Sequence, residues 1–221
     1  MKNRLIVIDG LDGSGKTTQF DIVKKLLGER YAVKAISFPE YDKPSSALVK
    51  MYLNGEISKN AADINAYAAS SFYAVDRYAS YKQFWEKNYN DGELILASRY
   101  TTSNAIHQME KLPRREWDGY LEWLADYEYN KLGLPRPDCV IFLDMPVEIS
   151  QRLMLARYNG DESKKDIHEA NVAYLQGCRK SALYAAEKCG WGVIECSRDG
   201  EPLPIEEITA AIMKYIEDNA L

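Results

Sequence analysis

The sequence contains little of the chemistry that metal clusters, disulfide frameworks and membrane spans require. Only two histidines occur among its 221 residues, His107 and His168, and they stand too far apart in the chain to suggest a metal site. The four cysteines show no C-x-x-C spacing, so we expect reduced thiols. The first apolar run, residues 5–8, ends at Asp9 and is too short for a signal peptide or a membrane span. These absences lead us to expect a cytoplasmic protein with no membrane partner.

The chain also has no excess of positive charge, with 28 Lys and Arg against 33 Asp and Glu. The formal net charge is −5 at pH 7, whereas a general nucleic-acid binder usually carries a basic surface, so we expect no nucleic-acid partner. The hydrophobic and charged fractions, 46% and 28%, are ordinary for a globular protein. The length suits one domain spanning residues 1–221, and the sequence shows neither an internal repeat nor a low-complexity tract.

What the chain does contain is a regular alternation of two kinds of segment. Short runs rich in Ile, Val and Leu predict strands buried on both faces at 4–9, 32–38, 93–98, 138–144 and 192–197. Longer stretches with helical periodicity separate them, at 16–29, 61–89, 114–131, 146–157, 167–189 and 204–218. This order predicts an α/β fold with a parallel sheet flanked by helices on both faces. The polar stretch at about 157–166 is predicted to be a short lid.

The loop after the first predicted strand has the pattern of a phosphate-binding loop. Its residues "GLDGSGKT" fit G-x-x-x-x-G-K-[ST], and the loop follows a strand and precedes a helix. Backbone N–H groups at a helix N-terminus form a nest for anions. Lys16 is expected to reach the β and γ phosphates, and the Thr17 hydroxyl to ligate Mg²⁺. The predicted ATP-binding residues of the loop are Gly10, Gly13, Ser14, Gly15, Lys16, Thr17 and Thr18.

Two further absences narrow the class of nucleotide-binding protein. No N-K-x-D guanine motif occurs, and no D-x-x-G follows a strand in the expected place, which argues against a GTPase. The chain is also short for a motor ATPase with its coupling elements. A small kinase is therefore the leading interpretation.

A kinase needs an acceptor site, and the middle of the chain supplies candidates for one. Tyr73 and Arg77 are four residues apart on a predicted helix and share a face. The third predicted strand ends at Ser98, and the next residue is Arg99. Ligands of parallel sheets collect beyond the carboxyl ends of the strands, so we expect Arg99 and Asp12 to lie together beside the phosphate loop.

The combination of these segments resembles the thymidylate kinase family over nearly the full length of the chain. The resemblance rests on "DGLDGSGKTTQ", "FPEY", "FYAVDR", "SRYTTSNAIHQ" and "PDCVIFLDMPVEISQR". It implies a P-loop NTPase fold with a five-stranded parallel sheet. It further implies Mg²⁺-dependent transfer of a phosphoryl group from ATP to dTMP, usually in a homodimer.

In that family's terms, one set of residues is expected to bind the thymidine part of dTMP. Tyr73 stacks on the thymine ring, while Arg77 donates a hydrogen bond to O4. Asn104 satisfies N3–H with Gln108 as support, and His107 lies near the sugar, where it disfavours a ribose 2′-hydroxyl. Cytosine has an amino group in place of O4, so it would leave Arg77 without an acceptor. Phe38 and Tyr41 are expected to form walls of the same pocket.

A second set is expected to handle phosphate. Arg99 clamps the dTMP phosphate, and Asp12 lies near the acceptor sugar and phosphate. Arg152 matches a family arginine near ATP. The lid is expected to supply a positive charge for the transferring phosphoryl group from Arg157, Lys164 or Lys165.

The chain departs from the family pattern at two positions. The family's third strand commonly ends Asp-Arg, but here Ser98 precedes Arg99. Ser98 is still predicted to bind magnesium through water, with Asp9 or Asp144 as compensating carboxylates. Some members carry an arginine in the phosphate loop after the acidic residue, where this chain has Gly13. The serine leaves two alternatives open, which are a catalytically weak nucleotide-binding regulator and a related nucleotide or deoxynucleoside kinase.

Overall fold

The computed structural model describes residues 4–59, 63–157 and 172–221. Its main feature is a parallel five-stranded sheet with strand order β2-β3-β1-β4-β5. The strands are β1 (Arg4–Gly10), β2 (Val33–Ser37), β3 (Leu94–Ser98), β4 (Cys139–Asp144) and β5 (Gly192–Glu195). Each lies within two residues of a predicted strand at both ends, so the predicted fold class is confirmed.

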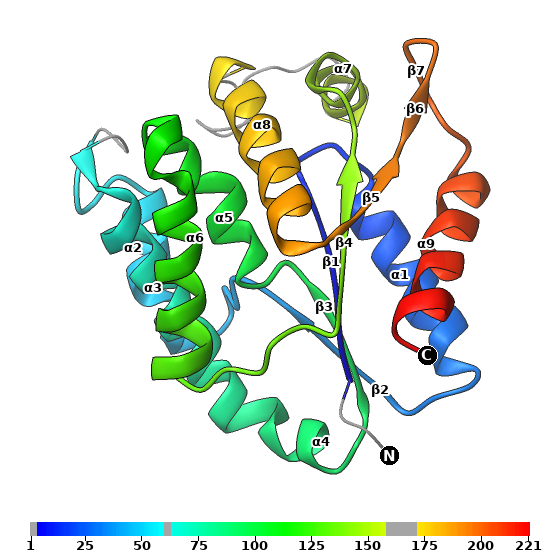
Figure 1. The fold of residues 1–221 in the computed structure, drawn as a ribbon, viewed down its shortest axis with the longest axis horizontal. Helices are drawn as coiled ribbons and strands as arrows, with labels where there is room; N and C mark the ends of the chain where they lie inside the picture. Colours follow the sequence, from blue (N-terminus) through cyan, green and yellow to red (C-terminus); the bar gives the residue numbers. More distant parts are fainter. Residues whose placement is uncertain (1–3, 60–62, 158–171) are drawn as a thin grey trace.

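Alternate residues of the central strand face opposite sides of the sheet, because side chains along a strand alternate in direction. Ile6 and Ile8 belong to a core that contains residues of α1 (Lys16–Gly28) and α9 (Ile205–Asn219). Leu5 and Val7 belong to a second core with side chains from the end of the long helical segment after α3. Figure 1 shows α1 and α9 on one side of the sheet, and α3, α5, α6 and α8 on the other.

The helices on that second side are shorter and more divided than their periodicity predicted. The predicted helix 61–89 consists of α3 (Ala66–Ser80), a π-helical turn (Tyr81–Trp85) and α4 (Glu86–Asn90). α3 begins at Ala66 because Asn65 Oδ1 accepts a hydrogen bond of 2.8 Å from the amide of Ala68. The predicted helix 114–131 consists of a 3₁₀ turn (Arg114–Glu116), α6 (Trp117–Ala125) and a π-helical turn (Asp126–Lys131).

The remaining elements include three that the strand and helix ranges above did not contain. These are α2 (Ala47–Leu53), α5 (Thr102–His107) and the hairpin of β6 (Ser197–Arg198) and β7 (Glu201–Pro202). α7 (Val147–Arg157) matches its prediction, and α8 is described over Val172–Cys189. Within the described ranges, no helix is long and apolar enough to cross a membrane.

The topology brings several loops to the carboxyl edge of the sheet. The phosphate loop follows β1 at this edge, and the segments after β2 and β3 leave the sheet there as well, since the three strands are parallel and paired in register. α5 begins four residues after β3 ends, and it contacts α8 on the same side of the sheet. The fold therefore places the candidate acceptor residues beside the phosphate loop.

Candidate active site

A pocket of about 380 Å³ opens beside the phosphate loop at the carboxyl edge of the sheet. Its lining comes from the ends of β2 and β3 and the loops after β1, β2 and β3, from the start of α1 and the end of α2, and from α3, α5 and α8. Twelve residues predicted from the sequence line it: Asp12, Lys16, Thr17, Phe38, Tyr41, Tyr73, Arg77, Ser98, Arg99, Asn104, His107 and Gln108. The pocket thus joins the predicted nucleotide end to the predicted acceptor end.

The phosphate loop has the backbone that anion binding requires. Gly13 and Gly15 have φ values of 78° and 81°, a region that side chains beyond glycine rarely adopt. α1 begins at Lys16, so its first backbone N–H groups point out of the helix toward the loop. Lys16 is 9% exposed, and its Nζ donates to the Gly10 carbonyl at 3.1 Å. The Lys16 side chain thus folds back onto the phosphate loop, beside the backbone N–H groups that would bind phosphate.

The donor set fits a nucleotide phosphate and a hard divalent cation. Ser14 Oγ is buried, and it has no hydrogen-bond partner among the described residues. Thr17 is exposed at the first turn of α1 and lines the pocket, where its hydroxyl is the expected oxygen ligand for Mg²⁺. Thr18 is exposed at the next position but does not line the pocket.

Asp12, Arg99 and His107 form one charged cluster inside the pocket. Arg99 Nη2 donates to Asp12 Oδ1 at 2.5 Å, and Arg99 Nη1 lies 3.1 Å from His107 Nε2. Burial alone would raise the pKa of Asp12, but Arg99 and Lys16 hold it well below its usual range. Burial and the neighbouring Arg99 lower the pKa of His107 to about 3. At neutral pH the histidine is therefore uncharged beside an ionised pair.

The carboxylates of Asp9 and Asp144 both accept hydrogen bonds from neighbouring side chains. Asp9 Oδ2 accepts hydrogen bonds of 2.7 Å from both Thr102 and Ser103, which fixes the start of α5. Asp144 accepts two bonds from Arg179, at 2.6 and 2.8 Å. Asp9 Oδ1 also lies 3.9 Å from Arg99 Nη1. That either carboxylate compensates for the serine at the end of β3 stays a prediction.

Arg77 and Asn104 are linked through a buried acidic residue. Glu128 is 0% exposed and accepts from Arg77 Nε at 2.7 Å and from Arg77 Nη2 at 2.5 Å. Asn104 Nδ2 donates to the same carboxylate at 3.0 Å. Burial by itself would lower the pKa of Arg77, but the charge and hydrogen bonds of Glu128 raise it above its ordinary value. Glu128, which does not line the pocket, thus fixes the side chains of both Arg77 and Asn104.

The loop after β2 carries Phe38 and Tyr41 into the pocket. Phe38 is 4% exposed and precedes a cis peptide bond to Pro39, while Tyr41 is 51% exposed. Asp76 holds this loop, since its carboxylate accepts from the amide of Glu40 at 2.9 Å and from Ser45 Oγ at 2.6 Å. α3 thus fixes the loop with one residue while the adjacent Arg77 lines the pocket.

Among the predicted residues outside the phosphate loop, four are not part of the described pocket. Arg152 lies on α7, where Nη2 donates to the Gly200 carbonyl at 3.1 Å and to Glu201 at 2.7 Å. It therefore contacts the β6–β7 hairpin. The side chain of Arg157, together with Lys164 and Lys165, lies outside the residues that the structure describes. Their predicted roles stay predictions.

Six residues that line the pocket were not predicted from the sequence, namely Ser37, Pro39, Leu53, Tyr100, Ser103 and Tyr174, and neither was Glu128, which lies behind it. Tyr174 of α8 lines the pocket, and its hydroxyl lies 3.4 Å from His107 Nδ1. Glu128 is separated from Arg77 by 51 positions and from Asn104 by 24, so no local spacing points to it. Its only sequence signal is a carboxylate within an aromatic stretch, "DYEYN".

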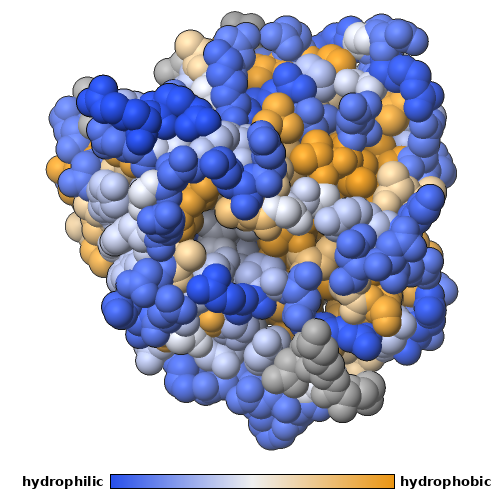
Figure 2. Space-filling view, viewed as in Figure 1, coloured by the Kyte–Doolittle hydropathy of each residue, from blue (hydrophilic) through white to orange (hydrophobic). Residues whose placement is uncertain are grey.

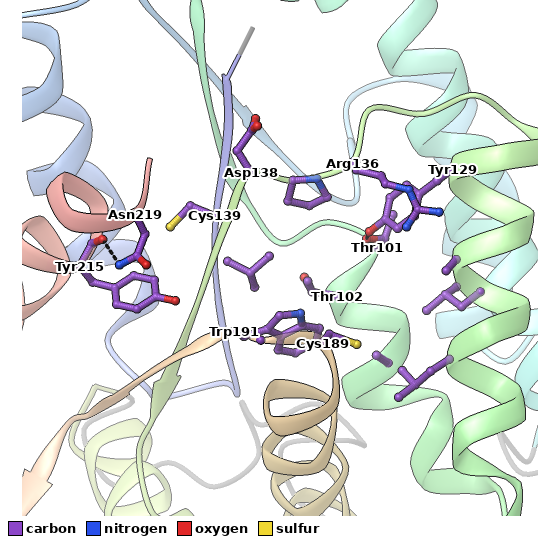
Figure 3. A pocket seen from close by; sticks show the side chains of 17 residues that line it. Thr101, Thr102, Tyr129, Arg136, Asp138, Cys139, Cys189, Trp191, Tyr215 and Asn219 are labelled. Atoms are coloured by element: carbon purple, nitrogen blue, oxygen red, sulfur yellow. Dashed lines mark hydrogen bonds between the residues drawn. The ribbon is translucent and has the colours of Figure 1, made fainter. Parts of the chain in front are cut away.

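A second pocket of about 320 Å³ lies across α5 from the first. α5 and the residue before it contribute Thr101, Thr102 and Ala105 to this pocket, whereas Asn104, His107 and Gln108 line the first one. Figure 3 shows Tyr129, Arg136 and Thr101 gathered at one end of it, and Cys139, Tyr215 and Asn219 at the other. Figure 2 shows the corresponding face of the molecule hollowed near its centre.

Comparison with known proteins gives one consistent result. The family model described as "Thymidylate kinase" matches residues 8–208. A "Thymidylate kinase" of Mycobacterium tuberculosis (strain ATCC 25618 / H37Rv) is 29% identical over 197 residues, covering 85% of this chain and 87% of that protein. A "Probable thymidylate kinase" of Pyrobaculum aerophilum is 26% identical over 212 residues, covering 96% and 95%. A solved thymidylate kinase structure from Candida albicans has a TM-score of 0.69 at 20% identity, over 98% of this chain and 92% of that one, and shows the same fold.

Proposed function

The chain belongs to the thymidylate kinase family, and from this premise we propose that it transfers the γ-phosphoryl group of ATP to dTMP, giving ADP and dTDP. The observation that carries the proposal is a single pocket lined by both Lys16 and Thr17 of the phosphate loop and by Arg77 and Asn104 of the acceptor end. A kinase must hold donor and acceptor in line at such a junction.

The phosphate loop and its neighbours provide the positive charge for the transfer. Lys16 Nζ is placed to move from the Gly10 carbonyl onto the β and γ phosphates of ATP. Arg99 is placed to bind the dTMP phosphate with the N–H groups that Asp12 does not occupy. Phosphoryl transfer depends mainly on such positioning and charge neutralisation, so a missing carboxylate at residue 98 is compatible with activity.

Magnesium and the lid complete the proposal. Thr17 Oγ1 would hold Mg²⁺ directly and Ser98 through water, and the bound ion would neutralise charge on the β and γ phosphates. Arg157, Lys164 and Lys165 are proposed as the lid groups that reach the transferring phosphoryl. Arg152, on the solvent side of α7, is proposed to lie near the base of ATP.

The acceptor end is proposed to select thymine by a complementary pattern of hydrogen bonds. The N–H groups of Arg77 that Glu128 leaves unused donate to O4, and Asn104 Oδ1 accepts from N3–H. Tyr73 and Phe38 provide aromatic surface against the ring. His107 is uncharged and bonded to Arg99, so it occupies space near the sugar without adding charge.

We infer that the protein works as a homodimer in the cytoplasm, with no nucleic-acid or membrane partner. The helices α2 and α3 contact one another and expose apolar side chains, among them Met51 at 39%, Val75 at 44% and Tyr78 at 40%. A second copy covering this surface would remove it from water. Light scattering after size-exclusion chromatography is expected to give twice the chain mass of 25.2 kDa, and a monomer would refute the dimer.

A coupled assay of ADP release tests the proposed reaction. Purified protein is given Mg·ATP with dTMP, dUMP, dCMP, AMP or thymidine as acceptor, and we expect dTMP to be preferred. dUMP should be weaker because it lacks the 5-methyl group, and dCMP poor because its amino group faces Arg77. Preference for thymidine would indicate a deoxynucleoside kinase, and tight nucleotide binding without dTDP formation would indicate a regulator.

The matched variants Lys16→Ala and Lys24→Ala show whether the activity belongs to this site. Both remove one lysine charge from α1, but Lys24 is exposed on the outer face of the helix. We expect Lys16→Ala to lose turnover by about 10²–10³-fold with an unchanged circular dichroism spectrum. Near-native turnover of a folded Lys16→Ala protein would refute the assignment of the phosphate loop.

A further inference from the structure

A buried carboxylate, Glu128, connects two pocket residues that come from different helices. Its oxygens accept from Arg77 of α3 at 2.7 and 2.5 Å and from Asn104 of α5 at 3.0 Å. Glu128 itself lies in the π-helical turn after α6. All three side chains are 2% exposed or less, so these bonds form away from bulk water. Three separate elements therefore meet at one acidic side chain.

The two partners of the Asn104 amide determine which way the amide faces. Nδ2 donates to Glu128 Oε1 at 3.0 Å and to the Ser70 carbonyl at 3.2 Å. A carboxylate paired with a guanidinium and a backbone carbonyl are both acceptors, so the NH₂ group must point toward them. Oδ1 is the amide atom left for a ligand, and it requires a donor from that ligand.

The same carboxylate determines which edge of the Arg77 guanidinium faces the pocket. Glu128 engages Nε and Nη2 in the paired geometry that fixes the plane of a guanidinium. The remaining N–H groups belong to the side that lines the pocket. The pocket therefore presents donors from Arg77 and an acceptor from Asn104. Thymine offers the complementary acceptor O4 and donor N3–H, whereas cytosine offers the opposite pattern at both positions.

Residues that line the second pocket contact the turn that carries Glu128. Tyr129, the next residue, forms a hydrogen bond between its hydroxyl and Thr101 Oγ1. The guanidinium of Arg136 lies 4.5 Å from the centre of the Tyr129 ring. Figure 3 shows these three side chains together at one end of that pocket. Glu128 thus sits on a turn that is fixed on its outer side as well.

We propose that Glu128 is a specificity-determining positioning residue, which selects thymine over cytosine by fixing the orientations of Arg77 and Asn104. The inference rests on the proposed function. Glu128 does not line the pocket, so it acts through its two partners. Glu128 bonds to Arg77 and Asn104, whereas Lys16 donates to the Gly10 carbonyl and Arg99 to Asp12. The loss of Glu128 should therefore alter acceptor choice more than phosphoryl transfer.

The test measures kcat and KM for dTMP and dCMP in wild type and in Glu128→Gln. Glutamine has one acceptor oxygen and one NH₂ group, so it cannot accept from Arg77 at two points and from Asn104 as well. We expect the ratio of kcat/KM for dTMP over dCMP to fall about tenfold. The change should lie mainly in a higher KM for dTMP, with kcat changed much less. The Ser70 carbonyl still orients Asn104, so the preference should weaken rather than reverse.

Two further variants separate orientation from charge. Glu122→Gln makes the same chemical change at an exposed position of α6 and should leave the ratio unchanged. Glu128→Asp keeps the charge beside Arg77 but shortens the side chain by one methylene, so it cannot bridge both partners. We expect an intermediate fall in the ratio. Calorimetric Kd values for dTMP and dCMP should follow the same order in all four proteins.

Each outcome decides the proposal. A folded Glu128→Gln or Glu128→Asp protein that keeps the wild-type ratio overturns it. Loss of the fold in both variants, seen as the absence of a cooperative melting transition, also overturns it, because Glu128 would then be a residue of the core alone. A wild type that phosphorylates neither acceptor refutes the proposed function and removes the basis of this inference. A wild type that prefers dTMP, with unchanged variants, refutes the inference only.

Discussion

Replacing Gly13 with alanine should destabilise the protein more than the same change at a glycine of equal backbone conformation. Gly13 has φ of 78°, and a Cβ there would lie 2.8 Å from the Ser150 carbonyl and 3.0 Å from Met154 Cγ. Both of those residues belong to α7. Gly133 has φ of 70°, but a Cβ there meets no atom within 4 Å. The pair therefore shares the backbone strain, and only Gly13 adds a clash with a neighbouring helix.

The magnitude follows from these distances. The left-handed conformation costs an alanine about 1–2 kcal/mol at either position, and the gain from a less flexible unfolded chain is also common to both. The clash with a helix backbone adds about 1–3 kcal/mol at Gly13. For a protein of this length each kcal/mol corresponds to about 2–4 °C in Tm. We expect Gly13→Ala to melt about 2–12 °C below Gly133→Ala.

Thermal unfolding of the nucleotide-free proteins, followed by circular dichroism, measures this difference. ATP titration supplies a second readout, because a displaced phosphate loop should raise the Kd for ATP in Gly13→Ala and leave it unchanged in Gly133→Ala. Equal Tm values for the two variants would show that α7 does not press on the loop. The Cβ of any other side chain at residue 13, including arginine, would meet α7 in the same way.

Three other predictions concern the pocket. Arg77→Met should lower the free energy of unfolding by about 3–5 kcal/mol in urea, because Glu128 would be left as an uncompensated buried charge. The double variant Arg77→Met/Glu128→Leu should recover most of that loss. Equal stabilities of the single and double variants would contradict this. Ser98→Asp should keep the fold and change kcat only modestly at saturating Mg·ATP and dTMP. The new carboxylate adds an oxygen near the metal but also competes for Arg99. A large gain in kcat would instead indicate that the wild type had lost catalysis at this position. The pKa of His107 is about 3 in the folded protein, below its unfolded value of 6.5. The unfolded chain therefore takes up the proton first on acidification, and the free energy of unfolding falls between about pH 6.5 and 3. Urea unfolding at pH 7 and pH 5 should show a smaller loss of stability for His107→Gln than for wild type, and an identical loss would disprove the shifted pKa.

The fold was accessible from the sequence because its signals are local. Each buried parallel strand is a short apolar run, and the runs are separated by segments of helical length, so order and type could be predicted together. Helix ends were harder. The start of α3 depends on the side chain of Asn65, and the ends of α3 and α6 pass into π-helical turns that periodicity does not show. α2 is only seven residues long, below the length at which periodicity is informative.

The site was predictable where function depends on neighbours in the chain. The phosphate loop is one continuous segment, and Arg99 follows directly on a strand whose direction fixes its position. Sequence spacing could not predict the hydrogen-bond partners or the protonation of the site residues. Arg99 binds Asp12, and His107 is uncharged because it is buried beside that arginine. These properties arise from contacts between residues 8 and 87 positions apart.

Glu128 shows the limit of sequence reasoning most clearly. The family resemblance assigned Arg77 and Asn104 to a thymine pocket, but by residue type alone an arginine and an amide are compatible with several bases until their orientations are fixed. That orientation comes from a residue outside the pocket, on a turn that no motif marks. A relative with the same pocket residues and a different group behind them would present a different pattern of donors and acceptors. In this chain, acceptor specificity should therefore depend on the buried contacts of the pocket residues as much as on the pocket residues themselves.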